Sequence, residues 1–458
     1  MPDAIGDAEP AACRRPDRLA QGHRRLFPRH SWFTRPSWFV PGGTEMNITN
    51  GHDPFLDSCE TADLFRRSAF LWLNGRLDAG LRYAAAAVDV KCEENHEYCE
   101  LTPFWHIALL IKAREFDAGR RVLNSIEIQR GKTGSQRVTA TSHTVRGELL
   151  FAMGRVDEGI AEIGVGLRIA ERCGIRALLP NGYVVMALGA LRRADMRTCL
   201  HYVDKLTREA LLGYFGQAAG AWVTALAMEA RSGVECAAGL IDGIVMNPVV
   251  LRQLLVSEPA AASWLVRAAG KLGARDVGKV LVSAASAASA SHSRLSVVRA
   301  SALHAAGLLE EDAGKLCEAS ALHPDRWCGA SARENLADLL AKRGSEQGDA
   351  IRTLESALGT YTAVGATRDA SRVVNKLREF GVRRGATRTV GRERILLNGL
   401  TSTEFAVAEL VSQGHTNNDV GRQLFISRHT VAFHLKKVYQ KMNVASRVEL
   451  AANWKAMR

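Results

Sequence analysis

The sequence predicts an all-α protein, a solenoid of helical hairpins followed by a small four-helix domain. Three observations lead to this prediction. Residues 60–380 are rich in Ala and Leu, poor in Pro, and lack the apolar–polar alternation of β-strands. Within them one pattern recurs: a polar turn, then Asp or Glu, often Gly two residues later, then an apolar helix. The last sixty residues carry more closely spaced helix-start and helix-stop signals.

Composition suggests a polyanionic partner for one end of the chain. The 458 residues are enough for roughly two to four domains, and 47% hydrophobic with 24% charged residues is typical of globular proteins. The net charge is +12, and the segment from Arg383 to the end, with 13 Lys and Arg against 5 Asp and Glu, holds +8 of it. Such clustering favours nucleic acid as a partner, although a solvated basic face would give the same imbalance.

The N-terminal segment has the composition of a disordered chain. Arg, Pro and isolated aromatic residues occur there without periodicity, so we expect residues 1–50 to be disordered. Met46 begins a plausible start, which leads us to expect that the first 45 residues are a mis-assigned extension. A basic arm that touches DNA is the alternative.

The repeated pattern has a nearly constant period. Successive acidic positions are 39, 40, 38, 40, 41, 36 and 37 residues apart. An acidic residue at a helix start accepts hydrogen bonds from free amides and complements the helix dipole, and a small residue lets the paired helix approach. These positions are therefore interpreted as structural: Asp78, Asp117, Asp157, Asp195, Glu235, Asp276, Asp312 and Asp349.

One such hairpin cannot bury its apolar stripe alone, so we expect about eight of them to stack over residues 58–382. The units resemble tetratricopeptide repeats loosely. Two short motifs within them are rejected as sites. Gly131–Thr133 reads GKT, but position 126 is Ile where a phosphate loop needs Gly, and no strand precedes it.

The second rejected motif is a possible zinc site. Cys92, His96 and Cys99, with His106 beyond, offer soft ligands, yet their spacing matches no common zinc module and the segment is an acidic loop. We therefore predict no metal and no cofactor. Motifs for catalysis are lacking as well, so we expect a protein that is not an enzyme.

Cellular location follows from two further absences. We find no run of 18 apolar residues and no signal peptide, and the nine cysteines show no paired spacing. We therefore expect a cytoplasmic, nucleoid-associated protein with no membrane contact.

The tail is predicted as a basic linker, residues 383–398, and a compact domain, residues 399–458. Its helices are marked by capping signals. Thr401 with Glu404, Thr416 with Asp419, Ser427, and Ser446 with Glu449 each start a helix, and Gly414 ends the first. The third helix has an inward apolar stripe with spacings of 4, 3 and 4 residues: Val431, Leu435, Val438 and Met442.

The opposite face of the third helix fits the major groove of DNA. It presents apolar residues suited to thymine methyl groups and a lysine suited to guanine, and the predicted base contacts are His429, Ala432, Phe433 and Lys436. Polar and basic residues around it are predicted to contact phosphates: Thr416, Asn417, Ser427, Arg428, Thr430, Lys437, Lys441 and Arg447. His434, at the edge of the inward stripe, is predicted to pack and to form hydrogen bonds.

The tail resembles the LuxR-type helix-turn-helix domain. The matching residues are Leu400, Thr401, Glu404, Gly414, Asn417, Leu424, Ser427, Thr430, Val431, His434, Lys441, Val444, Arg447 and Leu450. Thr403 and Gly421 depart from the family, which usually has Arg and Ala there. The resemblance implies a third helix that reads the major groove and a fourth that often dimerises. Residues 327–385 resemble, more loosely, the segment before this domain in large actinobacterial LuxR regulators, which usually carry an NTPase module that this chain lacks.

Two functional hypotheses follow. The first is a sequence-specific transcription regulator that binds double-stranded DNA as a homodimer through its fourth tail helix, with a protein or small-molecule effector bound by the repeats. The alternative is an interaction scaffold whose tail does not read DNA.

Overall fold

The computed structural model describes residues 59–90, 92, 97–130, 135–209, 216–344, 347–382, 400, 402–424 and 427–456. Within these residues every regular element is a helix and none is a strand, which confirms the predicted all-α class. The predictions for residues 1–50, for the GKT motif, for the linker 383–398 and for His96 lie outside the described residues.

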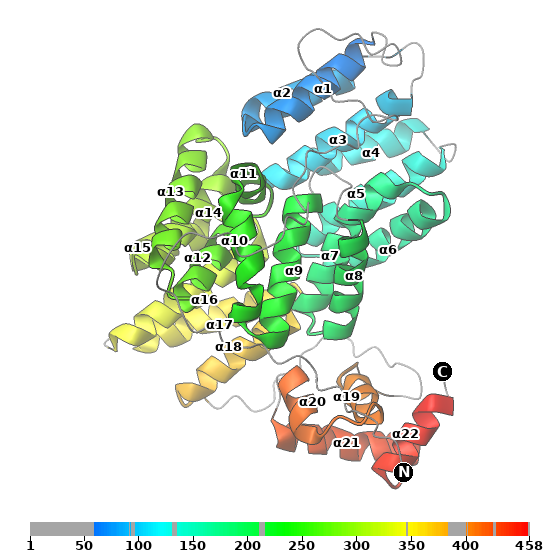
Figure 1. Cartoon of the computed structure of the whole chain (residues 1–458), viewed down its shortest axis with the longest axis vertical. Coiled ribbons are helices and arrows are strands. Elements are labelled where there is room, and N and C mark those ends of the chain that lie inside the picture. The colour runs from blue at the N-terminus through cyan, green and yellow to red at the C-terminus, as the bar shows by residue number, and fades with distance from the viewer. Residues whose placement is uncertain are drawn as a thin grey trace, which may run out of the picture.

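Eight helical hairpins form the larger part of the molecule (Figure 1). In chain order they are α1 (Glu60–Leu73) with α2 (Leu77–Asp89), α3 (Glu97–Ala113) with α4 (Phe116–Arg130), α5 (Gln136–Ala152) with α6 (Val156–Arg172), α7 (Leu179–Arg192) with α8 (Met196–Arg208), α9 (Gly216–Ser232) with α10 (Ala238–Met246), α12 (Ala261–Lys271) with α13 (Arg275–Ser291), α14 (Ser296–Leu309) with α15 (Ala313–Leu322), and α16 (Arg326–Arg343) with α17 (Gln347–Ala363).

Four further elements interrupt or end the series: the short helices η1 (Arg176–Leu178) and η2 (Val234–Ala237), then α11 (Pro248–Ser257) and α18 (Thr367–Glu379). After α18, Gly381 adopts a positive φ of 76°, as expected for a residue that follows a helix end.

No single described helix is both long and apolar enough to cross a membrane. One strongly bent pair, Val234–Met246 with Pro248–Ser257, passes such a test on length and composition.

Seven of the eight acidic positions lie at the beginning of the second helix of a hairpin, and Glu235 lies in η2, directly before α10. Their role as caps is confirmed at two of them only. Asp195 accepts a hydrogen bond from an amide at 3.0 Å, and so does Asp312. Asp78, Asp157 and Asp276 instead lie one residue inside their helices, where the carboxylate complements the helix dipole without capping it.

The predicted role of the small residue is clearest where α5 crosses α6. A Cβ atom at Gly159 would lie 2.7 Å from the carbonyl oxygen of Gly147, and one at Gly147 would lie 2.7 Å from that of Gly159. Because a carbon atom cannot approach an oxygen so closely, the two backbones can meet only while both positions are Gly.

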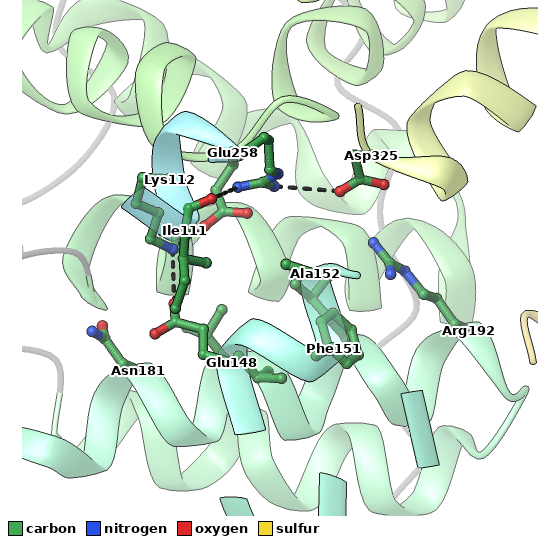
Figure 2. Close-up of a pocket in the computed structure, with 14 residues that line it drawn as sticks. Ile111, Lys112, Glu148, Phe151, Ala152, Asn181, Arg192, Glu258 and Asp325 are labelled. Carbon is green, nitrogen blue, oxygen red and sulfur yellow. Dashed lines mark hydrogen bonds and ion pairs between the residues drawn. The ribbon is translucent and has the colours of Figure 1, made fainter. Parts of the chain in front are cut away.

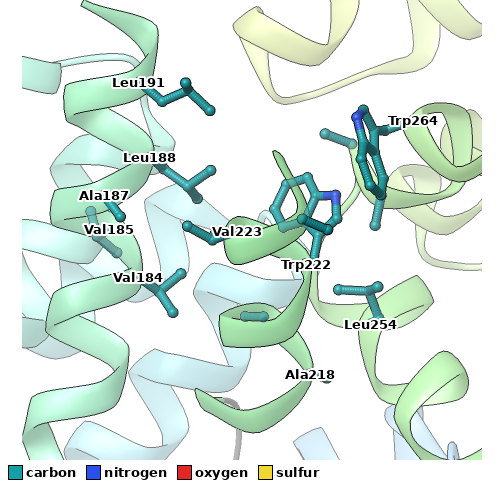
Figure 3. Packing of buried hydrophobic residues seen from close by; sticks show 14 of the residues in the cluster. Val184, Val185, Ala187, Leu188, Leu191, Ala218, Trp222, Val223, Leu254 and Trp264 are labelled. Carbon is teal, nitrogen blue, oxygen red and sulfur yellow. The ribbon is translucent and has the colours of Figure 1, made fainter. Parts of the chain in front are cut away.

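The main core runs through the middle hairpins. In Figure 3, Val184, Leu188 and Leu191 of α7 point toward Trp222 and Val223 of α9. Trp264 of α12 and Leu254 of α11 extend the same apolar cluster toward the later repeats. These residues are all buried.

The series of repeats folds back on itself. A ring nitrogen of His292, in the turn after α13, hydrogen-bonds the carbonyl oxygen of Gly75, in the turn after α1, at 2.5 Å. The side chain of Arg252 in α11 also lies against Gly75. The turn of the first hairpin is thus tied to elements that lie near the middle of the chain.

Candidate nucleic-acid interface

The four tail helices are α19 (Ser402–Ser412), α20 (Asn417–Leu424), α21 (Arg428–Met442) and α22 (Arg447–Ala456). They pack around one apolar core whose buried members are Leu400, Val407, Ala408, Val411, Val420, Val431, Leu435, Val438, Val444, Leu450 and Trp454. Three residues of the predicted inward stripe of α21 are fully part of it, and the fourth, Met442, packs against its edge. This core holds α21 with its opposite face outward.

The predicted caps that bracket the helix-turn-helix are confirmed. The Thr416 amide donates to the Asp419 carboxylate at 3.1 Å, and the Asp419 amide donates to the Thr416 hydroxyl at 3.3 Å. Ser427 caps α21 by accepting a hydrogen bond from the Thr430 amide at 3.0 Å. Such caps fix where α20 and α21 begin, and therefore which residues of α21 face outward.

The helix ends are equally well defined. Gly414 follows α19 with a φ of 93°, and Asn443 ends α21 in the left-handed conformation with a φ of 52°. At the start of α22, the Glu449 amide donates to Ser446 Oγ at 3.1 Å, while the Glu449 carboxylate accepts from the Ala445 amide at 2.7 Å.

Glu404 forms an ion pair across the tail domain. Its predicted capping contact with Thr401 remains a prediction, because Thr401 lies outside the described residues. The carboxylate of Glu404, only 4% exposed, accepts a hydrogen bond from Lys441 Nζ at 2.6 Å. The pair compensates the buried charge of Glu404 and links α19 to the end of α21.

Arg447 is also engaged within the domain. Its guanidinium donates to Asn417 Oδ1 at 3.2 Å and to the backbone carbonyl of His415. The side chain therefore joins the start of α22 to the start of α20. Lys441 and Arg447, both predicted as phosphate contacts, thus hold the helices of the domain in place.

The outward face of α21 carries all four predicted base contacts, and each is exposed: His429, Ala432, Phe433 and Lys436. Phe433 is the most telling of them, because 56% of this large apolar side chain is exposed. Lys437 Nζ lies 4.6 Å from the centre of the Phe433 ring, within the range of a cation–π contact. The face combines apolar surface with positive charge.

The polar residues predicted to contact phosphates lie around this face. The hydroxyls of Ser427 and Thr430 are 2.9 Å apart at the start of α21, beside the exposed Arg428. Asn417 and Thr416 stand at the start of α20. Both helix starts present backbone amides, which are suited to anions.

His434 lies at the edge of the core, half-buried, with its ring 5.7 Å from that of Phe433 in an edge-to-face arrangement. Burial lowers its pKa. Its Nδ1 has no hydrogen-bond partner among the described residues. His434 thus packs as predicted, but its Nδ1 forms no hydrogen bond with the described residues.

The tail meets the repeats through its first helix. Arg197 at the start of α8 pairs with Glu409 of α19. In the view of Figure 1, α19 and α20 lie nearer to the repeats than α21 does. The outward face of α21 is therefore not the surface that contacts the repeats through this pair.

Comparison with known proteins agrees with this geometry. Residues 398–453 match the family described as bacterial regulatory proteins, luxR family. The C-terminal domain is a LuxR-type helix-turn-helix domain.

The curated relatives match the chain over a segment about as long as this domain. HTH-type transcriptional regulators of Mycobacterium bovis and Mycobacterium tuberculosis are 51% identical over 51 residues, 11% of this chain and 6% of theirs. The nitrate/nitrite response regulator homolog of Haemophilus influenzae is 40% identical over 52 residues, 11% of this chain and 25% of that one. The matched segment thus spans a small part of each relative.

Among solved structures, a Rap protein complexed with Competence and Sporulation Factor aligns with 70% of this chain and 99% of its own, at 16% identity and a TM-score of 0.41. The TPR domain of P58(IPK) aligns with 84% of this chain and 99% of its own, at 13% identity and a TM-score of 0.22.

The repeats are predicted to bind an effector, and the sequence does not indicate where. Between the repeats lies a small cavity of about 40 Å³. Lys112 of α3 lies there between two carboxylates, 3.0 Å from Glu148 of α5 and 2.9 Å from Glu258 after α11 (Figure 2). Burial opposes the charge of Lys112, but the two carboxylates raise its pKa above the ordinary value. Nearby, Arg114 pairs with Asp325 at 3.4 Å.

This cavity is too small for an ordinary ligand, since small-molecule pockets typically measure about 300–1,000 Å³. Five of its charged side chains pair with one another: Lys112 with Glu148 and Glu258, and Arg114 with Asp325. We therefore interpret it as a structural junction between distant repeats.

Three cysteines come together at the N-terminal end of the repeats, in a grouping that sequence reasoning missed. Cys92 and Cys99 were considered as metal ligands together with His96. The structure brings them next to Cys59. Cys59 is 33 residues before Cys92 in the sequence, so no short motif could reveal the grouping.

Proposed function

We propose that the protein is a sequence-specific DNA-binding transcription regulator. The observation that carries the proposal is the exposed face of α21, where Ala432, Phe433 and Lys436 stand outward on a helix whose other side is buried. A solvent-exposed Phe is unfavourable in water and becomes favourable against a thymine methyl group. The LuxR-type domain match and the names of the relatives support the same function.

In this proposal α21 lies in the major groove. His429, Ala432, Phe433 and Lys436 contact base edges, whereas the residues around them position the helix on the phosphates. The positioning residues are Thr416, Asn417, Ser427, Arg428, Thr430, Lys437, Lys441 and Arg447. Lys441 and Arg447 support the domain from within, through Glu404 and Asn417.

We also propose that two copies pair through α22. Val448 on this helix is 79% exposed, the largest exposure among the large apolar side chains described. A symmetric pair of reading helices would bind inverted half-sites about one helical turn apart.

We further propose that the repeats bind a protein or small-molecule effector on a surface outside the small cavity.

The full-length protein should bind a subset of genomic fragments in a mobility-shift assay, and added salt should weaken the binding. Lys436→Glu places a negative charge on the proposed groove face and should abolish selective binding. Arg294→Glu makes the same change in an exposed turn of the repeats and should leave binding intact. Unselective or absent binding by the wild-type protein would favour the scaffold alternative.

A further inference from the structure

Three cysteines from three segments converge at one end of the repeats. Cys59 directly precedes α1, Cys92 lies in the connection between α2 and α3, and Cys99 lies in the first turn of α3. Their sulfur atoms all lie within 4.8 Å of one another, and those of Cys59 and Cys99 are 3.3 Å apart. All three are partly exposed, so a solute can reach them.

The grouping is unusual for this chain. The other described cysteines are distributed over later repeats: Cys173, Cys199, Cys236, Cys317 and Cys328. No second group of three His, Cys, Asp or Glu side chains with this proximity occurs among the described residues. A disulfide would use two of the three sulfurs and leave the third without a role.

We infer that Cys59, Cys92 and Cys99 bind a thiophilic divalent cation, with Zn²⁺ as the ion best matched to them. Zn²⁺ is bound by thiolates at about 2.3 Å in a tetrahedron, which places ligand sulfurs about 3.8 Å apart. The separations here, from 3.3 Å to at most 4.8 Å, bracket that value. Thiolates disfavour Mg²⁺ and Ca²⁺, which take oxygen ligands. The three sulfurs leave one tetrahedral position for a fourth ligand.

Such an ion would fasten the first hairpin to the second. Helices α1 and α3 already contact each other farther from the cysteines. Trp105 Nε1 of α3 donates to Ser68 Oγ of α1 at 2.9 Å, and the Trp105 ring lies 5.4 Å from that of Phe65. Cys59 and Cys99 lie at the starts of α1 and α3, and Cys92 lies in the connection that precedes α3. The turn of the first hairpin is held by His292 at its other end, so a metal clamp would fix the end of the hairpin where the chain enters the repeats.

The first test needs no variant. Full-length protein purified with reductant and without chelator should contain one Zn²⁺ per chain by elemental analysis. Replacement with Co²⁺ should give the intense sulfur-to-cobalt charge-transfer band in the near ultraviolet. Alkylation with mass spectrometry should find these three cysteines protected until a chelator is added, and Cys173 and Cys317 reactive throughout because they are exposed.

The second test assigns the ligands. Cys59→Ser, Cys92→Ser and Cys99→Ser should each weaken Zn²⁺ binding by at least about tenfold, since even indirect changes to a metal site have effects of this size. Cys317→Ser is the matched control and should bind as the wild type does. Cys59→His keeps a zinc ligand at the position and should recover binding, which separates loss of a ligand from loss of the fold.

Three outcomes would overturn the inference. The reduced protein could take up neither Zn²⁺ nor Co²⁺. Bound metal could survive all three Ser substitutions. Peptide mapping could reveal a Cys59–Cys99 disulfide in a protein that takes up no metal after reduction, which would make the cluster a redox pair instead. DNA binding by the tail is measured separately, so none of these outcomes depends on the proposed regulator function.

Discussion

Lys112 in the repeats and the two adjacent lysines on α21 in the tail use their positive charge in opposite ways. In the repeats, Lys112 is buried and held between carboxylates from two other hairpins or connections. In the tail, Lys436 and Lys437 stand exposed on α21, and no described carboxylate pairs with either. The comparison shows that a count of basic residues says little about their role. A cation with internal partners maintains the architecture, whereas a cation without them is available to an external anion.

The largest expected effect follows from removing the buried cation. Lys112→Met should destabilise the repeats by about 3–5 kcal/mol, because it leaves Glu148 and Glu258 buried without compensation. Urea denaturation followed by circular dichroism measures the change. The same substitution in the tail, Lys436→Met, serves as control and should change stability by less than about 0.5 kcal/mol. If both substitutions lowered the free energy of unfolding by the same amount, the two lysines would not differ in their structural role.

Acid should weaken the repeats. Burial lowers the pKa of His323 to about 4, and both of its ring nitrogens lack a hydrogen-bond partner among the described residues. The pKa of the neighbouring His304 is also well below its usual value because of burial, and its Nε2 accepts a hydrogen bond from Asn335 at 2.8 Å. Both side chains are therefore neutral in the folded protein.

Because these two histidines have lower pKa values in the folded protein, the unfolded chain binds more protons between about pH 6.5 and pH 4. The free energy of unfolding should therefore fall as the pH falls through that window. For His323 the loss should approach about 3 kcal/mol. Denaturation midpoints measured between pH 7 and pH 4 test it. His323→Leu removes the titrating group, and its midpoints should fall less steeply; an identical slope in both proteins would contradict the assignment.

Two adjacent lysines should separate base reading from phosphate attraction. Lys436→Ala should weaken binding to the preferred site by about 1–3 kcal/mol and leave nonspecific binding nearly unchanged. Lys437→Ala should weaken all sequences alike and lower the slope of log K against log salt by about one. Fluorescence anisotropy at several salt concentrations resolves the two. If neither substitution had an effect, the outward face of α21 would not be the DNA-binding face.

The smallest effect is expected where the two regions touch. Arg197, 62% exposed, pairs with Glu409 across the contact between α8 and α19. Exposed pairs of this kind contribute about 0–1 kcal/mol, so Arg197→Ala should leave both the denaturation midpoint and the DNA affinity almost unchanged. A change in affinity of more than about tenfold would instead show that this contact controls the tail.

The parts predictable from sequence were those governed by local rules. The repeat period located the start of the second helix in seven hairpins, from Asp78 to Asp349, because acidic residues are favoured at helix starts and in the first turn. The capping signals at Thr416 and Ser427 located α20 and α21 for the same reason. The inward spacing of α21 then determined its outward face.

The parts not predictable depend on residues far apart in sequence. Nothing near Lys112 indicates that Glu258, 146 residues later, will lie beside it. Nothing near Glu404 indicates that Lys441, 37 residues later, will pair with it. Cys59 likewise joins Cys92 and Cys99 only after α1 has packed on α3. Local patterns identify helices, and tertiary packing decides which side chains become partners.

The closing of the repeats on themselves has a consequence for how this protein folds. In a simple repeat array each unit touches only its neighbours, so units can fold and unravel almost one at a time. Here His292 meets Gly75 across 217 residues, and Arg114 meets Asp325 across 211. Such distant contacts raise the contact order, which slows folding, and they couple the early hairpins to the late ones. The array should therefore unfold as one cooperative unit, with its ends protected from fraying.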